Sequence, residues 1–231
     1  MPTCSASAGP IQPYQGAAVG EAPALTRPAA PALILASASR TRARMMENAG
    51  LAFEIMPAAV DEAAVKRRLA AAGAMPREVA DTLAEAKAAQ VSQSIAADRP
   101  GALILGADQV LEFDGAILDK PADRPAAADH LRLLSGRRHR LVSAAVLLKD
   151  GQRIWGCDDR ASLVVRPLTD RFIAHYLDST GDDALDSVGA YRLEGLGAHL
   201  FASVEGDFFT ILGLPLLPLL EFLRGHGALE A

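Results

Sequence analysis

Two short apolar runs in the first half of the chain end abruptly at polar residues. Residues 32–36 (ALILA) precede Ser37, and residues 103–107 (LILGA) precede Asp108. Apolar runs of this length, bounded by polar or turn-forming residues, predict strands that are buried on both faces. Because ligands bind at the carboxyl ends of strands in an open α/β sheet, we expect a functional site at these two positions.

Capping and periodicity signals predict helices around these strands. Ser39 is typical of an N-cap, and the helix that it starts is expected to reach Asn48, with Gly50 as its stop. Residues 52–60 are rich in β-forming residues and predict a second strand. Two helices are then predicted, at residues 63–72 and from residue 76 to about 97.

The second half of the chain predicts further strands with fewer helices. A hairpin is expected over residues 109–118, with a turn at Asp114–Gly115, and a longer hairpin over residues 140–167 with a turn at Asp150–Gly151. Helices are expected at residues 125–134, 169–178 and 216–223. Residues 187–215 are rich in glycine and predict short strands and loops around a cleft. The element order indicates an α/β protein.

The composition is that of an ordinary globular protein with an acidic balance. The chain has 231 residues, of which 50% are hydrophobic and 22% charged, and its formal net charge is −5. This charge excludes a broad cationic surface for a nucleic-acid backbone, so we expect no nucleic-acid partner. An acidic protein that binds a polyanion needs a few focused bases and a divalent cation.

Cysteine content and hydropathy indicate a cytoplasmic protein with no membrane partner. Cys4 and Cys157 are too few for a secreted disulfide scaffold, and no apolar run approaches the length of a bilayer span. Residues 1–30 are rich in Ala, Pro and Gly, and we expect them to form a disordered extension before a domain at residues 31–226. A spurious upstream start codon would explain the same segment.

The segment from Ser37 to Arg42 is a candidate phosphate site. Small hydroxyl residues at a helix start offer free backbone N–H groups, and Arg42 adds a permanent charge that binds phosphate oxygens. The alternative is an N-cap beside a solvated basic face. The segment has neither a Walker lysine nor a GxGxxG pattern, so neither phosphate-loop motif applies.

A set of acidic residues is a candidate metal and acid–base site. Asp108, placed after a buried strand, would act as a general base or bind a divalent cation, and Asp61 and Glu62 would complete the site. The alternatives are a turn-capping aspartate and a pair of acids that complements a helix dipole. Lys87 and Lys120 are candidate bases, although most lysines are solvated surface residues.

The histidines and serines provide no further catalytic motif. The five histidines have no zinc-binding spacing and are expected to be surface or packing residues. No serine lies in a GxSxG elbow, so a hydrolase of that type is unsupported.

Five stretches taken together resemble the Maf family of nucleoside triphosphate pyrophosphatases. They are residues 33–62 (LILASASRTRARMMENAGLAFEIMPAAVDE), 83–88 (LAEAKA), 106–121 (GADQVLEFDGAILDKP), 131–136 (LRLLSG) and 189–216 (GAYRLEGLGAHLFASVEGDFFTILGLPL). They follow the family's order over nearly all of residues 32–225. The resemblance implies an α/β fold with a long, curved mixed sheet and two lobes around a central cleft, and it implies a homodimer.

The resemblance also implies a reaction and the residues that carry it. The reaction is hydrolysis of a nucleoside triphosphate between the α and β phosphates. Asp108 matches the family's proton acceptor, and Glu62 matches the acidic residue that helps to hold Mg²⁺ or Mn²⁺ with it. The positions that match phosphate-binding residues are Ser37, Ser39, Arg42, Lys87 and Lys120.

Three positions linked to base choice in the family fall at Thr41, Gln109 and Glu194. Gln109 and Glu194 resemble the branch that acts on 7-methyl-GTP, and either side chain is able to hydrogen-bond a guanine edge. Thr41 stands where Arg or Trp is usual, and Arg40 replaces the usual proline, so a stacking platform for a methylated base is missing. We therefore expect 7-methyl-GTP or another modified purine nucleotide as the substrate.

A second hypothesis is a non-catalytic regulator that responds to nucleotides. Maf-like proteins have been associated with cell division and septum formation, and in such a protein Asp108 would be merely structural. The presence of Asp108, Glu62, Lys87 and Lys120 together favours the enzyme.

Overall fold

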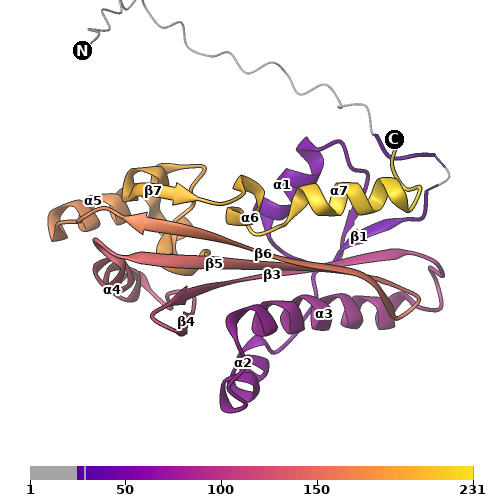
Figure 1. Cartoon of the computed structure of the whole chain (residues 1–231), viewed down its shortest axis with the longest axis horizontal. Coiled ribbons are helices and arrows are strands. Elements are labelled where there is room, and N and C mark those ends of the chain that lie inside the picture. The colour runs from indigo at the N-terminus through magenta and orange to yellow at the C-terminus, as the bar shows by residue number, and fades with distance from the viewer. Residues whose placement is uncertain (1–24, 29, 231) are drawn as a thin grey trace, which may run out of the picture.

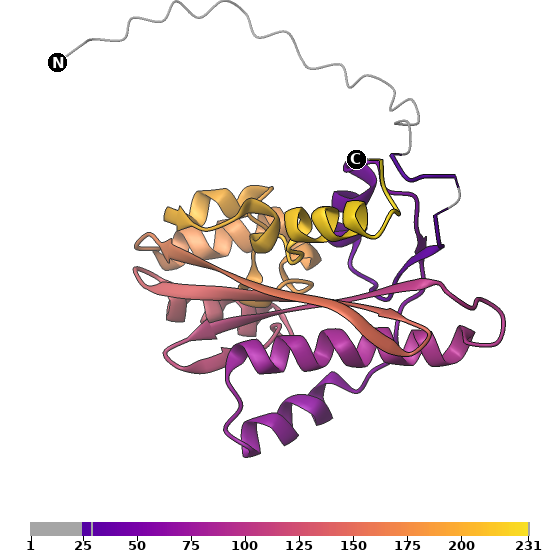
Figure 2. The same ribbon diagram turned by 45° about the vertical axis from the view of Figure 1, so that its right-hand side comes forward.

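Seven strands form one mixed sheet, with helices on both of its faces (Figures 1 and 2). The computed structural model describes residues 25–28 and 30–230. The strand order is β2-β1-β3-β5-β6-β7, and β4 lies beside β3. The predicted α/β class with a long mixed sheet is confirmed.

The bounds of the elements follow from the backbone hydrogen bonds. The strands are β1 (Leu33–Leu35), β2 (Glu54–Ile55), β3 (Leu103–Phe113), β4 (Ala116–Leu118), β5 (Arg138–Lys149), β6 (Gln152–Val165) and β7 (Phe201–Glu205). The α-helices are α1 (Arg40–Asn48), α2 (Glu62–Ala71), α3 (Pro76–Ile95), α4 (Arg124–Leu134), α5 (Asp170–Thr180), α6 (Phe208–Ile211) and α7 (Leu216–Gly225). Three 3-10 helices, η1 (Gly181–Ala184), η2 (Val188–Ala190) and η3 (Leu196–Leu200), precede β7.

Most of the predicted helices begin and end within two residues of their expected bounds, because their caps are local signals. The Oγ atom of Ser39 accepts a hydrogen bond from the backbone N–H of Arg42, as an N-cap should. The second predicted strand is shorter than expected: only Glu54 and Ile55 pair with β1, and both are exposed.

The sheet has an opening on one edge of β3. Asp108 lies beside this opening and not at the end of a strand, where it was expected. β1 runs parallel to β3 but pairs only as far as Leu105, and β4 pairs antiparallel from Leu111 onward. Between these points, no strand in the described part of the chain pairs with β3 on that side. Asp108 therefore lies in the middle of an 11-residue strand, opposite Ala144 of β5, and not at a strand end as predicted.

Alternating residues of the long strands supply three hydrophobic clusters. On one face, Ile104 and Val110 of β3 pack against α3. On the other face, Leu105 joins a cluster with α1 and α7 at one end of the sheet. Leu111 and Phe113 join a separate cluster with α4 and α5 at the other end. Side chains alternate between the two faces of a strand, so one face of β3 contributes to both of these clusters. The opening on the edge of β3 lies between the two clusters.

Helix α3 lies directly on the backbone of β3 at Gly106. A Cβ atom on this glycine would lie 2.0 Å from the carbonyl oxygen of Ala84 and 2.9 Å from the Cβ of Ala88. Only glycine allows so close an approach. Because Lys87 lies on α3 and Asp108 lies two residues beyond Gly106, this contact sets the distance between two predicted site residues.

The described residues before β1 correct part of the predicted N-terminal extension. Thr26 forms a bridge with Leu229, the N–H of Leu25 donates to the carbonyl of Gly50, and Oγ1 of Thr26 accepts from the N–H of Ala52. Residues 25–28 thus satisfy backbone groups of the C-terminal segment and are part of the folded body. Residues 1–24 and 29 lie outside the described residues.

Two other expectations concern the membrane and the thiols. Within the described residues, no helix combines the length and the hydrophobicity that a bilayer span requires. Cys157 is half-buried on β6, and burial, together with the charges of Asp158 and Asp159, raises the pKa of its thiol. Cys4 lies outside the described residues.

The contact at Gly106 gives the first prediction. We expect Gly106→Ala to lower the free energy of unfolding by about 1 to 3 kcal/mol, because the added methyl group forces α3 away from β3. Urea denaturation measures this change. Gly225→Ala is the matched control, since a Cβ there meets nothing within 4 Å, and it should leave stability unchanged or raise it by less than about 1 kcal/mol. Equal stability of both variants would contradict the expectation.

Candidate functional site

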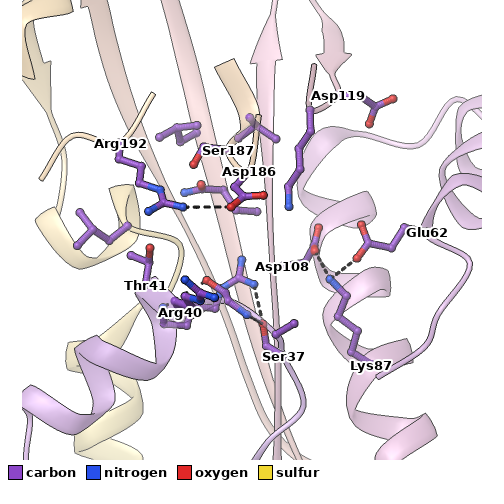
Figure 3. Close-up of a pocket in the computed structure, with 18 of the residues that line it drawn as sticks. Ser37, Arg40, Thr41, Glu62, Lys87, Asp108, Asp119, Asp186, Ser187 and Arg192 are labelled. Carbon is purple, nitrogen blue, oxygen red and sulfur yellow. Dashed lines mark hydrogen bonds and ion pairs between the residues drawn. The ribbon is translucent and has the colours of Figure 1, made fainter. Parts of the chain in front are cut away.

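A cavity of about 830 Å³ opens at the gap on the edge of β3 (Figure 3). Its wall is built by the β1–α1 turn, α2, α3, β3, the segment after β4, and the glycine-rich segment around η2 and α6. The structure brings ten of the eleven predicted site residues, all except Asp61, into this wall: Ser37, Ser39, Thr41, Arg42, Glu62, Lys87, Asp108, Gln109, Lys120 and Glu194. Residues up to 157 positions apart in the sequence therefore share one cavity.

A buried ion-pair group forms the floor of the cavity. The ammonium group of Lys87 lies 2.6 Å from Oδ1 of Asp108 and 2.6 Å from Oε1 of Glu62. Lys87 and Asp108 are 9% and 5% exposed, so neither charge is tolerable without its partner. Burial alone would raise the pKa of the Glu62 carboxyl, but the hydrogen bond and charge of Lys87, with the charges of Lys66 and Lys120, lower it overall.

The same two carboxylates suit a divalent cation that is shared with a substrate. Their oxygens converge on one point, where the ammonium of Lys87 now lies. Mg²⁺ is commonly held by one or two carboxylates, with phosphate oxygens and waters completing its shell. No group of three or more His, Cys, Asp or Glu residues in the described part of the chain is placed to hold a metal. The donor set therefore fits a cation that arrives with a polyphosphate, which stays a prediction.

Asp61 differs from the expectation that it would join the metal site. Its side chain accepts a hydrogen bond from the N–H of Ala64 at 2.9 Å and caps the start of α2. Asp61 is exposed and does not line the cavity. The alternative of a helix-start acid is thus correct for Asp61, whereas its neighbour Glu62 points into the cavity.

Arg42 connects two distant turns beneath the cavity. Its Nε donates to the carbonyl of Gly213 at 2.7 Å, and its Nη1 donates to Oγ of Ser37 at 3.2 Å. Burial lowers the pKa of the Arg42 guanidinium, while the charges of Asp108 and Glu62 act in the opposite direction. A guanidinium remains charged even so, and Arg42 therefore places a positive charge at the end of β1.

The helix-capping alternative for Ser39 is confirmed. Its Oγ caps α1, and its backbone N–H donates to Oγ of Ser37 at 3.3 Å. Both serines line the cavity at the start of α1, where the helix dipole favours an anion. Their contact with phosphate remains a prediction.

The amide nitrogen of Gln109 is used within the protein, and its predicted hydrogen bond to a guanine edge stays a prediction. Its Nε2 lies 2.9 Å from Oγ of Ser143 and 3.0 Å from the carbonyl oxygens of both Thr210 and Ile211. Three acceptors around this atom identify it as the amide nitrogen and use both of its protons. Gln109 therefore fixes α6 against the sheet and offers a ligand only its Oε1 acceptor.

Several charged residues of the cavity wall were not predicted as site residues from the sequence. They are Arg40, Lys66, Arg67, Asp119, Asp186 and Arg192. Lys66 follows Glu62 by four residues, and this helical spacing would have placed both on one face of α2. Arg192 approaches Asp183 and Asp186 at 3.5 Å, a pairing set by the fold of the segment before β7.

A buried histidine supports one aromatic residue of the wall. Tyr191 lines the cavity, and its hydroxyl lies 2.6 Å from Nε2 of His139. His139 is 2% exposed and its Nδ1 has no hydrogen-bond partner. Burial lowers the pKa of His139 to about 4 and raises the pKa of Tyr191 above its ordinary value. The expectation that His139 is a packing residue is confirmed.

Comparison with known proteins places this fold and site in one family. The model described as "Maf-like protein" matches residues 32–226, and the chain belongs to this family. A nucleoside triphosphate pyrophosphatase from Paramagnetospirillum magneticum is 53% identical over 196 residues, which are 85% of this chain and 99% of the relative. A 7-methyl-GTP pyrophosphatase from Rhizobium etli is 52% identical over 200 residues, which are 87% of this chain and 98% of the relative.

The environment of His139 gives the second prediction. Between pH 7 and pH 5 the unfolded chain binds a proton at His139, while the folded chain, with a pKa of about 4, does not. The free energy of unfolding is therefore highest above the pKa that His139 has in the unfolded chain. It should fall by about 2 kcal/mol as the pH falls from 7 to 5. Urea denaturation at pH 7, 6 and 5 measures the loss, and His139→Asn should reduce its pH dependence. An unchanged slope in the variant would refute this assignment.

Proposed function

We propose that the chain hydrolyses a nucleoside triphosphate between the α and β phosphates, releasing the nucleoside monophosphate and pyrophosphate. The observation that carries this proposal is the ion-pair group of buried Lys87 and Asp108 with half-buried Glu62, on the floor of a cavity large enough for a nucleotide. The names of the two relatives, which are about half identical to this chain, support the same reaction.

The proposed chemistry requires a base, positive charge and a positioned water. Lys87 contacts Oδ1 of Asp108, so Oδ2 is the oxygen that would accept the proton of the attacking water. The water oxygen attacks the α-phosphorus in line, the bond to the bridging oxygen breaks, and pyrophosphate leaves with that oxygen. Lys87 and Arg42 would offset charge on the phosphates, and Glu62 with Asp108 would hold Mg²⁺ or Mn²⁺, which supplies further charge neutralisation when bound.

The electrostatics of the cavity support a polyanionic substrate. Seven cationic side chains line the wall against five acidic ones, although the whole chain has a net charge of −5. Positive charge is thus concentrated where the predicted phosphate site lies. A focused field of this kind attracts an anion into a cleft of a protein that is acidic overall.

We further propose a guanine-type base, such as that of 7-methyl-GTP. Glu194 and Oε1 of Gln109 both offer acceptors to the cavity, and guanine presents adjacent N–H donors on its Watson–Crick edge. Thr41, in the wall of the same cavity, is smaller than the Arg or Trp that is usual at this position in the family. The printed name of the Rhizobium etli relative agrees with this choice for that protein.

The comparisons favour the hydrolase over the non-catalytic regulator of cell division and septum formation. A homodimer and a cytoplasmic location remain proposals, the first from the family resemblance and the second from the cysteine content.

The third prediction tests the reaction. Wild-type protein with Mg²⁺ should release pyrophosphate from at least one of dTTP, UTP, GTP, ITP and 7-methyl-GTP. Asp108→Asn should lower kcat at least about 100-fold, because the general base is lost. Asp98→Asn, at an exposed turn, is the matched control and should keep full activity. Pyrophosphate release by the Asp108 variant at the wild-type rate would sink the proposed role.

The fourth prediction tests base recognition. ITP lacks the 2-amino group of GTP, so a carboxylate at Glu194 should favour GTP over ITP by about tenfold in kcat/KM. Glu194→Gln replaces one acceptor by a donor and should bring this ratio close to one. Glu221→Gln on the exposed side of α7 serves as the control. The prediction fails if the ratio in the Glu194 variant equals that of the wild type.

A further inference from the structure

Helix α2 is held to the rest of the protein by few contacts. None of its ten residues is buried, and only the partly buried Val65 and Leu69 pack against the cluster under α3. The helix projects beyond α3, away from the sheet, in both views (Figures 1 and 2). Its position therefore depends strongly on polar contacts.

One face of α2 lines the cavity. Glu62, Ala63, Lys66 and Arg67 share this face, as their spacing of four residues requires. Glu62 is bound to Lys87 on the cavity floor, whereas Lys66 lies one turn further along α2. Its Nζ lies 2.6 Å from Oδ1 of Asp119, in the segment that follows β4. The Lys66–Asp119 pair thus joins α2 to a second element of the cavity wall.

The arrangement of the cavity indicates which part of a nucleotide would meet this pair. Arg192 and Thr41 lie on one side, Asp108 lies between, and Glu62 and Asp119 lie on the other side (Figure 3). With the base on the side of Arg192 and the α-phosphate at Asp108, the β- and γ-phosphates extend toward α2. This assignment rests on the function proposed above.

The pair is suited to exchange. The Asp119 side chain is 68% exposed and therefore well solvated, whereas that of Lys66 is 23% exposed. An ion pair with so exposed a partner contributes little to stability, so its loss is tolerable. A phosphate oxygen inside the less solvated cavity would form a stronger charge-assisted hydrogen bond with Lys66 than the well solvated carboxylate of Asp119 does.

We propose that Lys66 is a further substrate-binding residue, which leaves Asp119 for an oxygen of the β- or γ-phosphate when substrate enters. Asp119 then competes with the substrate for the ammonium group. Lys66 and Asp119 should consequently have opposite effects on affinity. If the pair were merely a structural clamp for α2, loss of either residue would weaken binding.

The test is calorimetric titration of the full chain with inorganic tripolyphosphate in the presence of a fixed excess of Mg²⁺. We expect Lys66→Met to weaken binding about fivefold to tenfold, and Asp119→Asn to strengthen it about twofold to fivefold. The double variant should bind like Lys66→Met, because Asp119 acts only through Lys66. In nucleotide hydrolysis, KM should rise for Lys66→Met and fall for Asp119→Asn, with little change in kcat.

Two matched variants control for the loss of charge alone. Lys149→Met removes a lysine at the far end of β5, and Asp178→Asn removes an aspartate that pairs with Arg124 on the surface. Both lie outside the cavity wall and should bind tripolyphosphate like the wild type.

The outcomes separate this inference from the proposed function. Opposite effects of the two variants on tripolyphosphate binding support the inference even if no nucleotide is hydrolysed, and that second result would overturn only the proposed function. Three results would each overturn the inference, whether or not nucleotides are hydrolysed. The Lys66→Met variant could bind tripolyphosphate with wild-type affinity, the Asp119→Asn variant could bind it more weakly, or the wild type could fail to bind it.

Discussion

The buried ammonium of Lys87 is the charge on which the arrangement of the site depends. A cation that is 9% exposed requires compensation, and Asp108 and Glu62 each provide it at 2.6 Å. The three residues belong to α3, β3 and the start of α2, so the ion pairs hold three elements together. The close contact of α3 with Gly106 makes this geometry possible, because no side chain separates the helix from the strand.

The opening in the sheet explains why these charges face a cavity and not the core. β1 stops after Leu35, and the antiparallel strand β4 ends at Leu118, opposite Leu111, so the middle of β3 has no neighbouring strand on that side in the described part of the chain. Asp108 can therefore be almost fully buried and still reach a ligand. Arg42, in the first turn of α1, reaches the carbonyl of Gly213 just before α7.

Charge is distributed differently in the cavity and in the chain as a whole. The whole chain has a net charge of −5, whereas the cavity wall contains more cationic than acidic side chains. Several of these cations are already paired, as Lys66 is with Asp119 and Lys87 is with two carboxylates. The protein thus keeps these cations in a half-buried site by pairing them with acids.

The sequence alone determined those features that arise from local signals. The N-cap at Ser39 and the helix bounds follow from capping chemistry and hydrophobic period, and motif order identified ten residues of the cavity wall. Tertiary structure decided the position of Asp108 within its strand, the use of both Gln109 amide protons by α6, and the bridge from Thr26 to Leu229. Each of these depends on hydrogen bonds between residues that are far apart in the chain, and their pairing exists only once the sheet has formed.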